Sequence, residues 1–300
     1  MIHKPVLTKE VLEYLNPKPN ENFIDGTVGQ GGHTLLLLEK IAPNGKVLGI
    51  DLDAGQIQNS RSALTAYTDR TILVHDSYSN IKEIVQKNNF KPVNGILLDL
   101  GYSSWQLEQS AKGFSFLKDE ALDMRYQSEI TNDKLQIPNN LTAAKIINEY
   151  PENEIERILE EYGEENFAKQ IAKAIVRQRE IRKIESTFQL KEIIEKTVRT
   201  GGNIHSATRS FQALRIAVND ELGNLQKALP NALSVLSSGG RLVVISFHSL
   251  EDRIVKNFFK EQEQQGIANI VTKKPVMAQL GEVSQNPRAR SAKLRAIIKI

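Results

Sequence analysis

The sequence predicts an α/β protein built on a parallel β-sheet, with a block of helices inserted into it. Apolar runs of strand length alternate with segments of helical length, and the strand candidates are residues 22–26, 46–51, 71–75 and 93–100. Strands that are apolar at almost every position are typical of a parallel sheet covered on both faces. From about residue 108 to 208 only helical periodicity occurs, and strand patterns return at 237–247 and 293–300.

The helices between the first strands follow from local signals. An opening helix is expected at about Thr8 to Leu15, where Pro17 and Pro19 stop it. Three further segments have helical length, at residues 34–42, 54–64 and 78–87.

The helical block is large enough to be a domain in its own right. The predicted organisation is therefore a discontinuous core, residues 1–107 and 209–300, and an inserted, mainly helical domain, residues 108–208. Its clearest helices cover 155–163 and 166–182. After it, a helix at 210–229 is expected to carry one apolar face, made of Phe211, Leu214, Val218, Leu222, Leu225 and Leu229.

Composition limits the class of protein. The 40% hydrophobic and 25% charged content is that of a soluble globular protein. No run reaches the roughly 18 apolar residues of a membrane helix, and the N-terminus lacks a secretory pattern, so we expect a cytoplasmic protein. There is no cysteine, which excludes disulfides, a thiolate nucleophile and zinc–thiolate sites. With a net charge of only +3, nucleic-acid binding must be argued from where the charges lie.

A glycine-rich loop follows the first strand, at residues 23–34. It lacks the lysine of a nucleotide P-loop, and the dinucleotide pattern G-x-G-x-x-G has Thr34 at its last position. An acid at the strand end followed by G-x-G, here Asp25, Gly29 and Gly31, suits S-adenosylmethionine. The acid can pair with the ligand's ammonium, while amides at the helix start bind its carboxylate.

The ends of the other strands also carry polar groups. Asp51 lies twenty residues after Gly31, where a carboxylate can bind both ribose hydroxyls, and this feature suits NAD equally well. Asp76 and Tyr78 follow the third strand at the expected adenine end, and Asp99 and Gln106 follow the fourth. Simpler roles remain open for some of these residues: helix capping for Asp25 and Asp51, and packing for Tyr78. His33, at the start of the following helix, could be a surface residue.

Several longer segments resemble the RsmH (MraW) family, bacterial methyltransferases that modify the 4-amino nitrogen of a decoding-centre cytosine in 16S ribosomal RNA. The segments run from the first strand to the C-terminus and include IDGTVGQGGHT, GILLDLGYSS, YGEENFAKQIAKAIV, SFHSLEDRIVKNFF and NPRARSAKLRAI. The resemblance implies a class I, Rossmann-like methyltransferase core with an inserted helical substrate-recognition domain. It also implies 16S rRNA, within the small ribosomal subunit, as the partner, and no membrane.

By this resemblance, S-adenosylmethionine is the cofactor. The residues expected to contact it are Gly31, Gly32, His33, Asp51, Tyr78, Asp99 and Gln106, with Asp25 and Gly29 from the loop pattern. Asp99 is the candidate catalytic residue: it either positions the cytosine amine or serves only the cofactor. The reaction requires no metal ion.

Two later segments carry further hypotheses. After the fifth strand, Ser249 and Asp252 are interpreted as a helix-capping pair, and His248 is a weaker candidate for contacting the target base. Near the C-terminus four cations occur with no acid among them, which suits RNA phosphates: Arg288, Arg290, Lys293 and Arg295. A second basic stretch, residues 168–183, follows an acidic one, so pairing of two helices is the alternative to RNA binding there.

Two other functions compete with methyl transfer. An NAD-dependent oxidoreductase shares the sheet, the glycine turn and the ribose carboxylate, but the last glycine and an obvious hydride-transfer pair are missing. A ribosome-assembly or RNA-binding factor with a vestigial cofactor site would have no need of Asp25, Asp51 and Asp99 together. DNA or protein as the substrate is opposed only by the resemblance.

Overall fold

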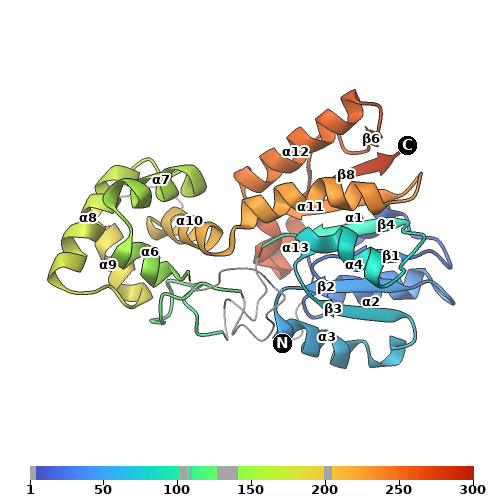
Figure 1. Ribbon diagram of the computed structural model, residues 1–300, viewed down its shortest axis with the longest axis horizontal. Coiled ribbons are helices and arrows are strands. Elements are labelled where there is room, and N and C mark those ends of the chain that lie inside the picture. Colours follow the sequence, from blue (N-terminus) through green and yellow to red (C-terminus); the bar gives the residue numbers. More distant parts are fainter. Residues whose placement is uncertain (1–4, 102–106, 108–109, 127–140, 199–204) are drawn as a thin grey trace. The chain divides into compact units, whose positions relative to one another are not determined.

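The computed structural model describes residues 5–101, 107, 110–126, 141–198 and 205–300. The chain separates into two compact units, the first made of residues 1–101 and 222–300 and the second of residues 102–221 (Figure 1). The predicted α/β fold with a mainly parallel sheet is confirmed in the first unit.

The first unit contains one sheet with the strand order β3-β2-β1-β4-β5-β8-β6, and β7 pairs with β8. Strands β1 to β5 are parallel, whereas β8 is antiparallel to β5, β6 and β7. From β1 the chain continues to β2 and β3 on one side, and β4 and β5 lie on the other side, so the strand order reverses between β1 and β4. Ligands of open α/β sheets bind at such a reversal. The strands are β1 (Phe23–Asp25), β2 (Val47–Asp51), β3 (Thr71–His75), β4 (Gly95–Asp99), β5 (Arg241–Ser246), β6 (Ala268–Ile270), β7 (Val276–Met277) and β8 (Lys293–Lys299).

Helices cover both faces of this sheet, which explains why its strands are apolar at consecutive positions. Along β4, Ile96 and Leu98 enter one apolar core, while Leu97 between them enters the core on the opposite face. The first core is closed by α4 (Ile81–Lys87), α11 (Glu221–Val235) and α12 (Ser249–Gln264), and the second by α1 (Thr8–Leu15) and α2 (Gly32–Lys40).

Shorter elements complete the first unit. They are α3 (Ala54–Ala63), α13 (Leu280–Gln285) and the 3₁₀ turns η1 (Thr65–Tyr67), η2 (Tyr78–Asn80) and η3 (Pro287–Ser291). Within the described part of the chain, every helix is too short or too polar to cross a membrane.

The described residues of the second unit fold as helices around their own apolar core. The helices are α6 (Ala143–Glu149), α7 (Glu152–Gly163), α8 (Ala168–Ile181), α9 (Thr187–Thr197) and α10 (Ala207–Asn219). Local signals define their starts: the Thr142 side chain accepts from the amide of Lys145, and Ser186 and Gln189 form a capping box before α9. The role of this unit in substrate recognition stays a prediction.

The single helix expected at 210–229 is wrong. The chain breaks at Asp220, whose φ of 46° is left-handed and ends α10, and α11 starts at the next residue. Phe211 and Leu214 therefore pack in the core of the second unit, whereas Leu225 packs in the first. The apolar repeat continues across the break, so hydrophobic periodicity alone gave no sign of it.

Candidate active site

The glycine-rich loop joins the end of β1 to the start of α2 and is held in a tight turn. Gly29 and Gly31 have φ values of 51° and 83°, which other residues adopt only with strain. The Gly31 amide donates to the Val28 carbonyl at 2.7 Å, and a Cβ atom at Gly31 would lie 3.3 Å from the Leu64 side chain. Glycine is thus favoured at both positions of the backbone path that leads into α2.

Asp25 is buried within this loop, with 1% of its surface exposed. One carboxylate oxygen accepts from the Thr34 hydroxyl at 2.7 Å, and the other accepts from the Thr27 amide at 3.2 Å. Burial raises the pKa of Asp25, and nearby His33 and the Thr34 hydrogen bond act in the opposite direction. Asp25 therefore fixes the loop from inside, and it is not a cap of α2, whose N-cap is Gly31.

Asp51 ends β2 and fixes the other side of the same loop. One of its oxygens accepts from the Gly29 amide at 2.8 Å, and the other accepts from the Asp53 amide at 2.9 Å. The cap of α3 is Asp53, which accepts from the Gly55 amide at 2.8 Å, so capping does not account for Asp51. Each oxygen of Asp51 keeps a lone pair for a further donor. Burial raises the pKa of Asp51 to about 7, although the two amides lower it.

His33 and Asp99 lie close together, one at the start of α2 and the other at the end of β4. His33, in the first turn of α2, has a side chain only 7% exposed, which excludes the surface position considered above. Its Nε2 is 3.5 Å from the Asp99 carboxylate at the end of β4, and the Asp99 amide donates to the Thr27 hydroxyl at 2.8 Å. Among the described residues, His33 Nδ1 and Asp99 Oδ1 are buried without a hydrogen-bond partner.

Buried polar atoms without partners are uncommon in folded proteins and indicate a missing ligand or water. Here a donor or acceptor on the imidazole and an acceptor on the carboxylate occur together at the reversal of the sheet. With Asp51 and the glycine turn they form a polar set that fits an amino-acid and nucleoside ligand.

The remaining cofactor candidates lie around this set. Tyr78, in the turn after β3, is half-buried and packs against the core beneath the sheet, and its Cβ is 3.4 Å from where a Cβ on Gly26 would be. Gly32 opens α2 against Pro5, whose Cγ would be 3.0 Å from an added Cβ. Asp76 is held by the Ser77 amide and the Asn80 side chain. Gln106 lies outside the described residues.

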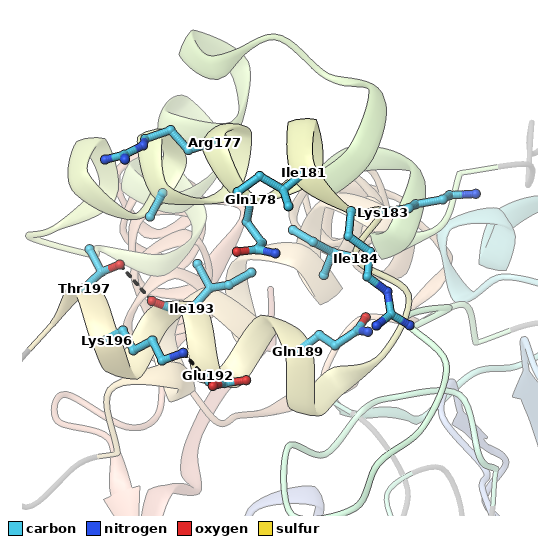
Figure 2. Close-up of a pocket in the computed structure, with 12 residues that line it drawn as sticks. Arg177, Gln178, Ile181, Lys183, Ile184, Gln189, Glu192, Ile193, Lys196 and Thr197 are labelled. Carbon is cyan, nitrogen blue, oxygen red and sulfur yellow. Dashed lines mark hydrogen bonds and ion pairs between the residues drawn. The ribbon is translucent and has the colours of Figure 1, made fainter.

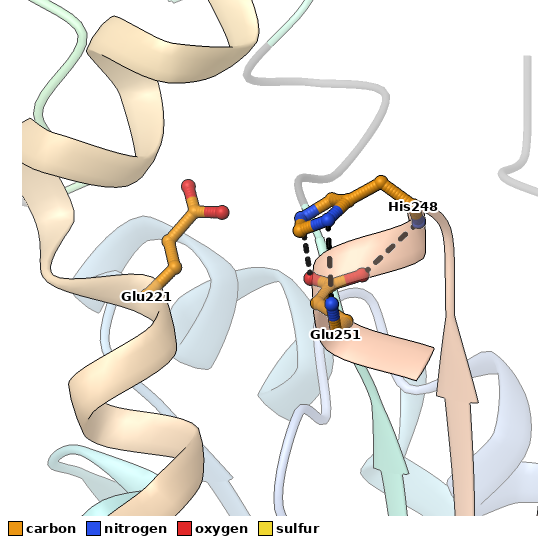
Figure 3. A group of neighbouring side chains, drawn as sticks. All are labelled: Glu221, His248 and Glu251. Atoms are coloured by element: carbon orange, nitrogen blue, oxygen red, sulfur yellow. Dashed lines mark hydrogen bonds and ion pairs between the residues drawn. The ribbon is translucent and has the colours of Figure 1, made fainter. Parts of the chain in front are cut away.

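The capping interpretation after β5 is wrong by one residue. The N-cap of α12 is His248, and its partner in the capping box is Glu251, not Ser249 with Asp252 (Figure 3). The Glu251 carboxylate accepts from the Phe247 amide at 2.8 Å and lies 3.3 Å from His248 Nε2. His248 thus has a structural role at the helix start. Contact with a target base stays a prediction.

The four C-terminal cations are not equivalent. Arg295 is only 7% exposed, and its guanidinium donates two hydrogen bonds to Asp252, at 2.6 and 3.1 Å. This pair joins β8 to α12 and removes Arg295 from the surface available to phosphates. Arg290 is exposed, and Arg288 and Lys293 are half-buried.

Thr27 and Thr34 of the loop were not predicted to belong to the site. Thr34 binds Asp25, and Thr27 binds the backbone of Asp99, so the pair connects the glycine loop to both neighbouring strands. The signal was present as a hydroxyl two residues after a strand-end acid, a spacing that often forms local side-chain to backbone bonds.

The fold and this site define an α/β protein of Rossmann-like architecture, with a polar set at the carboxyl ends of its strands that suits a nucleoside ligand. The sequence profile of the MraW methylase family matches residues 1–300, and the chain belongs to this family. It is 45% identical to the ribosomal RNA small subunit methyltransferase H of Heliobacterium modesticaldum, over 99% of this chain and 98% of that protein. It is 44% identical to the protein of that name from Geobacter sulfurreducens, over 99% of both. A methyltransferase structure from Streptococcus mutans, solved in complex with SAH, aligns over 100% of both chains with a TM-score of 0.48 and 15% identity.

Proposed function

We propose that this protein transfers a methyl group from S-adenosylmethionine to the 4-amino nitrogen of a cytosine in the decoding centre of 16S rRNA. The family and the curated relatives support S-adenosylmethionine-dependent methylation of small-subunit rRNA. The base, the nitrogen atom and the assembled subunit as substrate are the parts that we add. Cytoplasmic location stays a prediction.

The observation that carries the proposal is the buried pair His33 and Asp99, in which His33 Nδ1 and Asp99 Oδ1 have no hydrogen-bond partner among the described residues. In this assignment Asp51 binds the ribose hydroxyls, and the glycine turn with His33 holds the amino-acid end of the cofactor. Tyr78 lies along the adenine. When bound, the cofactor supplies an electrophilic methyl group on a sulfonium.

Asp99 is the group that we assign to the amine. The exocyclic nitrogen of cytosine is a poor nucleophile, because its lone pair is delocalised into the ring. A base taken out of its stack and held by hydrogen bonds to its amino hydrogens can present that lone pair in line with the methyl group. Asp99 Oδ1, which has no partner within the part of the chain that the structure describes, is an acceptor at the strand end where this amine would lie.

Methyl transfer leaves one proton too many on the amine. The nitrogen forms a bond to carbon as the sulfur–carbon bond breaks, and one N–H proton must then depart for the neutral methylated base to form. The Asp99 carboxylate can accept that proton through Oδ1, while Oδ2 faces His33 Nε2 at 3.5 Å. Positioned acid–base groups of this kind contribute about 10²–10⁴-fold in rate.

Cofactor affinity is expected to rise with pH through about 7. Ribose hydroxyls donate to Asp51, so its ionised form binds, and the pKa of Asp51 in the free protein is about 7. At pH 6 roughly a tenth of this group is ionised, so the Kd for S-adenosylhomocysteine should be about tenfold larger than at pH 8. Calorimetry at both values measures it. Asp51→Asn should flatten the profile, and a wild-type Kd that is constant from pH 6 to 8 would contradict this assignment.

The raised pKa of Asp51 also makes the stability of the folded protein depend on pH. Because burial raises the Asp51 pKa above the ordinary 3.8, the folded state holds this proton more tightly than the unfolded chain. The contribution to stability is complete below about pH 4 and is lost as pH rises through about 7. Because the ionised form of Asp51 is expected to bind S-adenosylhomocysteine more tightly, the bound ligand should raise Tm more at pH 8 than at pH 6.

A nicotinamide cofactor is the main alternative ligand for this fold. Titration with S-adenosylhomocysteine and with NAD separates the two, and we expect binding of the first alone. Labelled methyl from S-adenosylmethionine should then enter unmethylated 16S rRNA. Label found in ribosomal protein instead of RNA would refute the proposed substrate.

A further inference from the structure

A groove in the second unit lies between the C-terminal half of α8 and the helix α9 (Figure 2). Its volume is about 440 Å³. Arg177 and Lys183 lie toward its two ends, and Lys196 extends from α9 on the other side. Four cations line it, Arg177, Arg182, Lys183 and Lys196, against one carboxylate, Glu192.

The cations of this groove are mostly uncompensated. Lys196 pairs with Glu192 at 2.6 Å. The side chains of Arg177, Arg182 and Lys183 are exposed, and they form no ion pair or hydrogen bond in the parts of the chain that the structure covers. Three unpaired charges remain around one concave surface, where anionic groups of a ligand can approach them together.

Other arginines of the unit are engaged elsewhere. Arg125 binds Asp123, Arg215 binds Glu221 in a buried bidentate pair, and Arg179 donates to the carbonyls at the end of α6. Their contacts hold the unit together and leave them poorly suited to a ligand. Arg177 and Arg182 differ from these three arginines because their side chains have no such partner among the described residues.

Pairing of α8 with the acidic helix α7 was the alternative for this stretch. The structure shows a different arrangement within the described residues. Arg157 of α7 binds Glu154 at 3.0 Å and Glu161 at 2.7 Å, so two of these acids are paired along their own helix. No ion pair joins α7 to the basic side chains of α8 in these residues.

The rim of the groove is not purely ionic. Ile181, in the last turn of α8, is 81% exposed and stands beside Arg182 and Lys183. An exposed apolar side chain among cations suits a ligand that has both charged and apolar surface, such as the phosphates and ribose or base faces of RNA.

We propose that this α8–α9 groove binds the sugar–phosphate backbone of the substrate RNA through Arg177, Arg182 and Lys183. The inference rests on the proposed function, since rRNA is the ligand assigned to the protein. It adds a contact on the helical unit to the C-terminal candidates Arg288, Arg290 and Lys293 on the first unit. Phosphate contacts of this kind supply affinity and orientation without reading sequence.

The test compares a triple variant, Arg177→Gln, Arg182→Gln and Lys183→Gln, with wild type in binding to 16S rRNA over a range of salt concentrations. Each lost phosphate contact reduces the slope of log Kd against log salt by about one, so the slope should fall by about 2 to 3. The control carries the same charge change on the exposed lysines Lys18, Lys40 and Lys260 of the first unit, and its slope should match wild type. Circular dichroism and S-adenosylhomocysteine affinity confirm that both variants are folded.

The outcomes separate the two proposals. A wild-type salt slope in the triple variant, or an equal loss of slope in the control, would overturn the assignment of the groove to RNA. Methylation of 16S rRNA by the wild-type protein would still uphold the proposed function. Loss of binding to the assembled subunit but not to naked 16S rRNA would assign the groove to a ribosomal protein and also overturn it. If wild type neither binds nor methylates 16S rRNA, the proposed function fails and the groove loses its ligand with it.

Discussion

Asp99→Asn is expected to reduce kcat for methyl transfer by about 10²-fold or more, while the Kd for S-adenosylhomocysteine changes by less than about tenfold. The amide keeps the shape of the side chain, but it cannot accept the proton released by the amine. It also presents an NH₂ group either to the substrate or to His33 Nε2, which lies 3.5 Å from the carboxylate. Single-turnover kinetics with saturating cofactor isolates this step.

A matched control comes from another strand end. Asp76→Asn removes a carboxylate after β3 that is bound to Ser77 and Asn80, so it should affect cofactor binding more than kcat. Full turnover in Asp99→Asn with only weaker cofactor binding would show that Asp99 serves the cofactor alone.

Asp51→Ala is expected to weaken S-adenosylhomocysteine binding by about 10²-fold or more. Hydrogen bonds to a charged group contribute about 1.5–3 kcal/mol each, and the carboxylate is assigned two ribose hydroxyls. The change also frees the Gly29 and Asp53 amides that hold the loop, at 2.8 and 2.9 Å. Calorimetry at pH 8, where Asp51 is mostly ionised, measures the loss.

The control for Asp51 is two residues away. Asp53→Ala removes the cap of α3 and should cost about 1 kcal/mol of stability. Its effect on affinity should stay within a few fold. A change of less than about threefold in Asp51→Ala would remove the carboxylate from the cofactor site.

The strands were predictable because the sheet is buried on both faces. Residues such as Ile96, Leu97 and Leu98 are all fully buried, so each position had to be apolar and the runs stood out. The strand-end acids were predictable for a related reason, since polar side chains are conspicuous directly after such runs. The places of Asp51 and Asp99 at the ends of β2 and β4 could be predicted from their positions after these apolar runs.

Other features depend on contacts that sequence spacing does not reveal. Asp220 ends α10 in a left-handed conformation, while the apolar repeat simply continues into α11. Both His248 and Ser249 precede acids at capping distance, and only the position of the Glu251 carboxylate selects His248. Arg295 was predicted to be available to RNA phosphates, but β8 places its side chain against Asp252. In each case a partner distant in space, or a single backbone angle, decides the outcome.

The measurement that tests the central claim most directly identifies the methylated nucleoside. Unmethylated small ribosomal subunits and their extracted RNA are each incubated with the protein and labelled S-adenosylmethionine, and the RNA is digested and analysed by mass. We expect the label in cytidine methylated on its 4-amino nitrogen, with the subunit as the better acceptor. Label in another nucleoside, or none despite measured S-adenosylhomocysteine binding, would contradict the assignment of Asp99 to a cytosine amine.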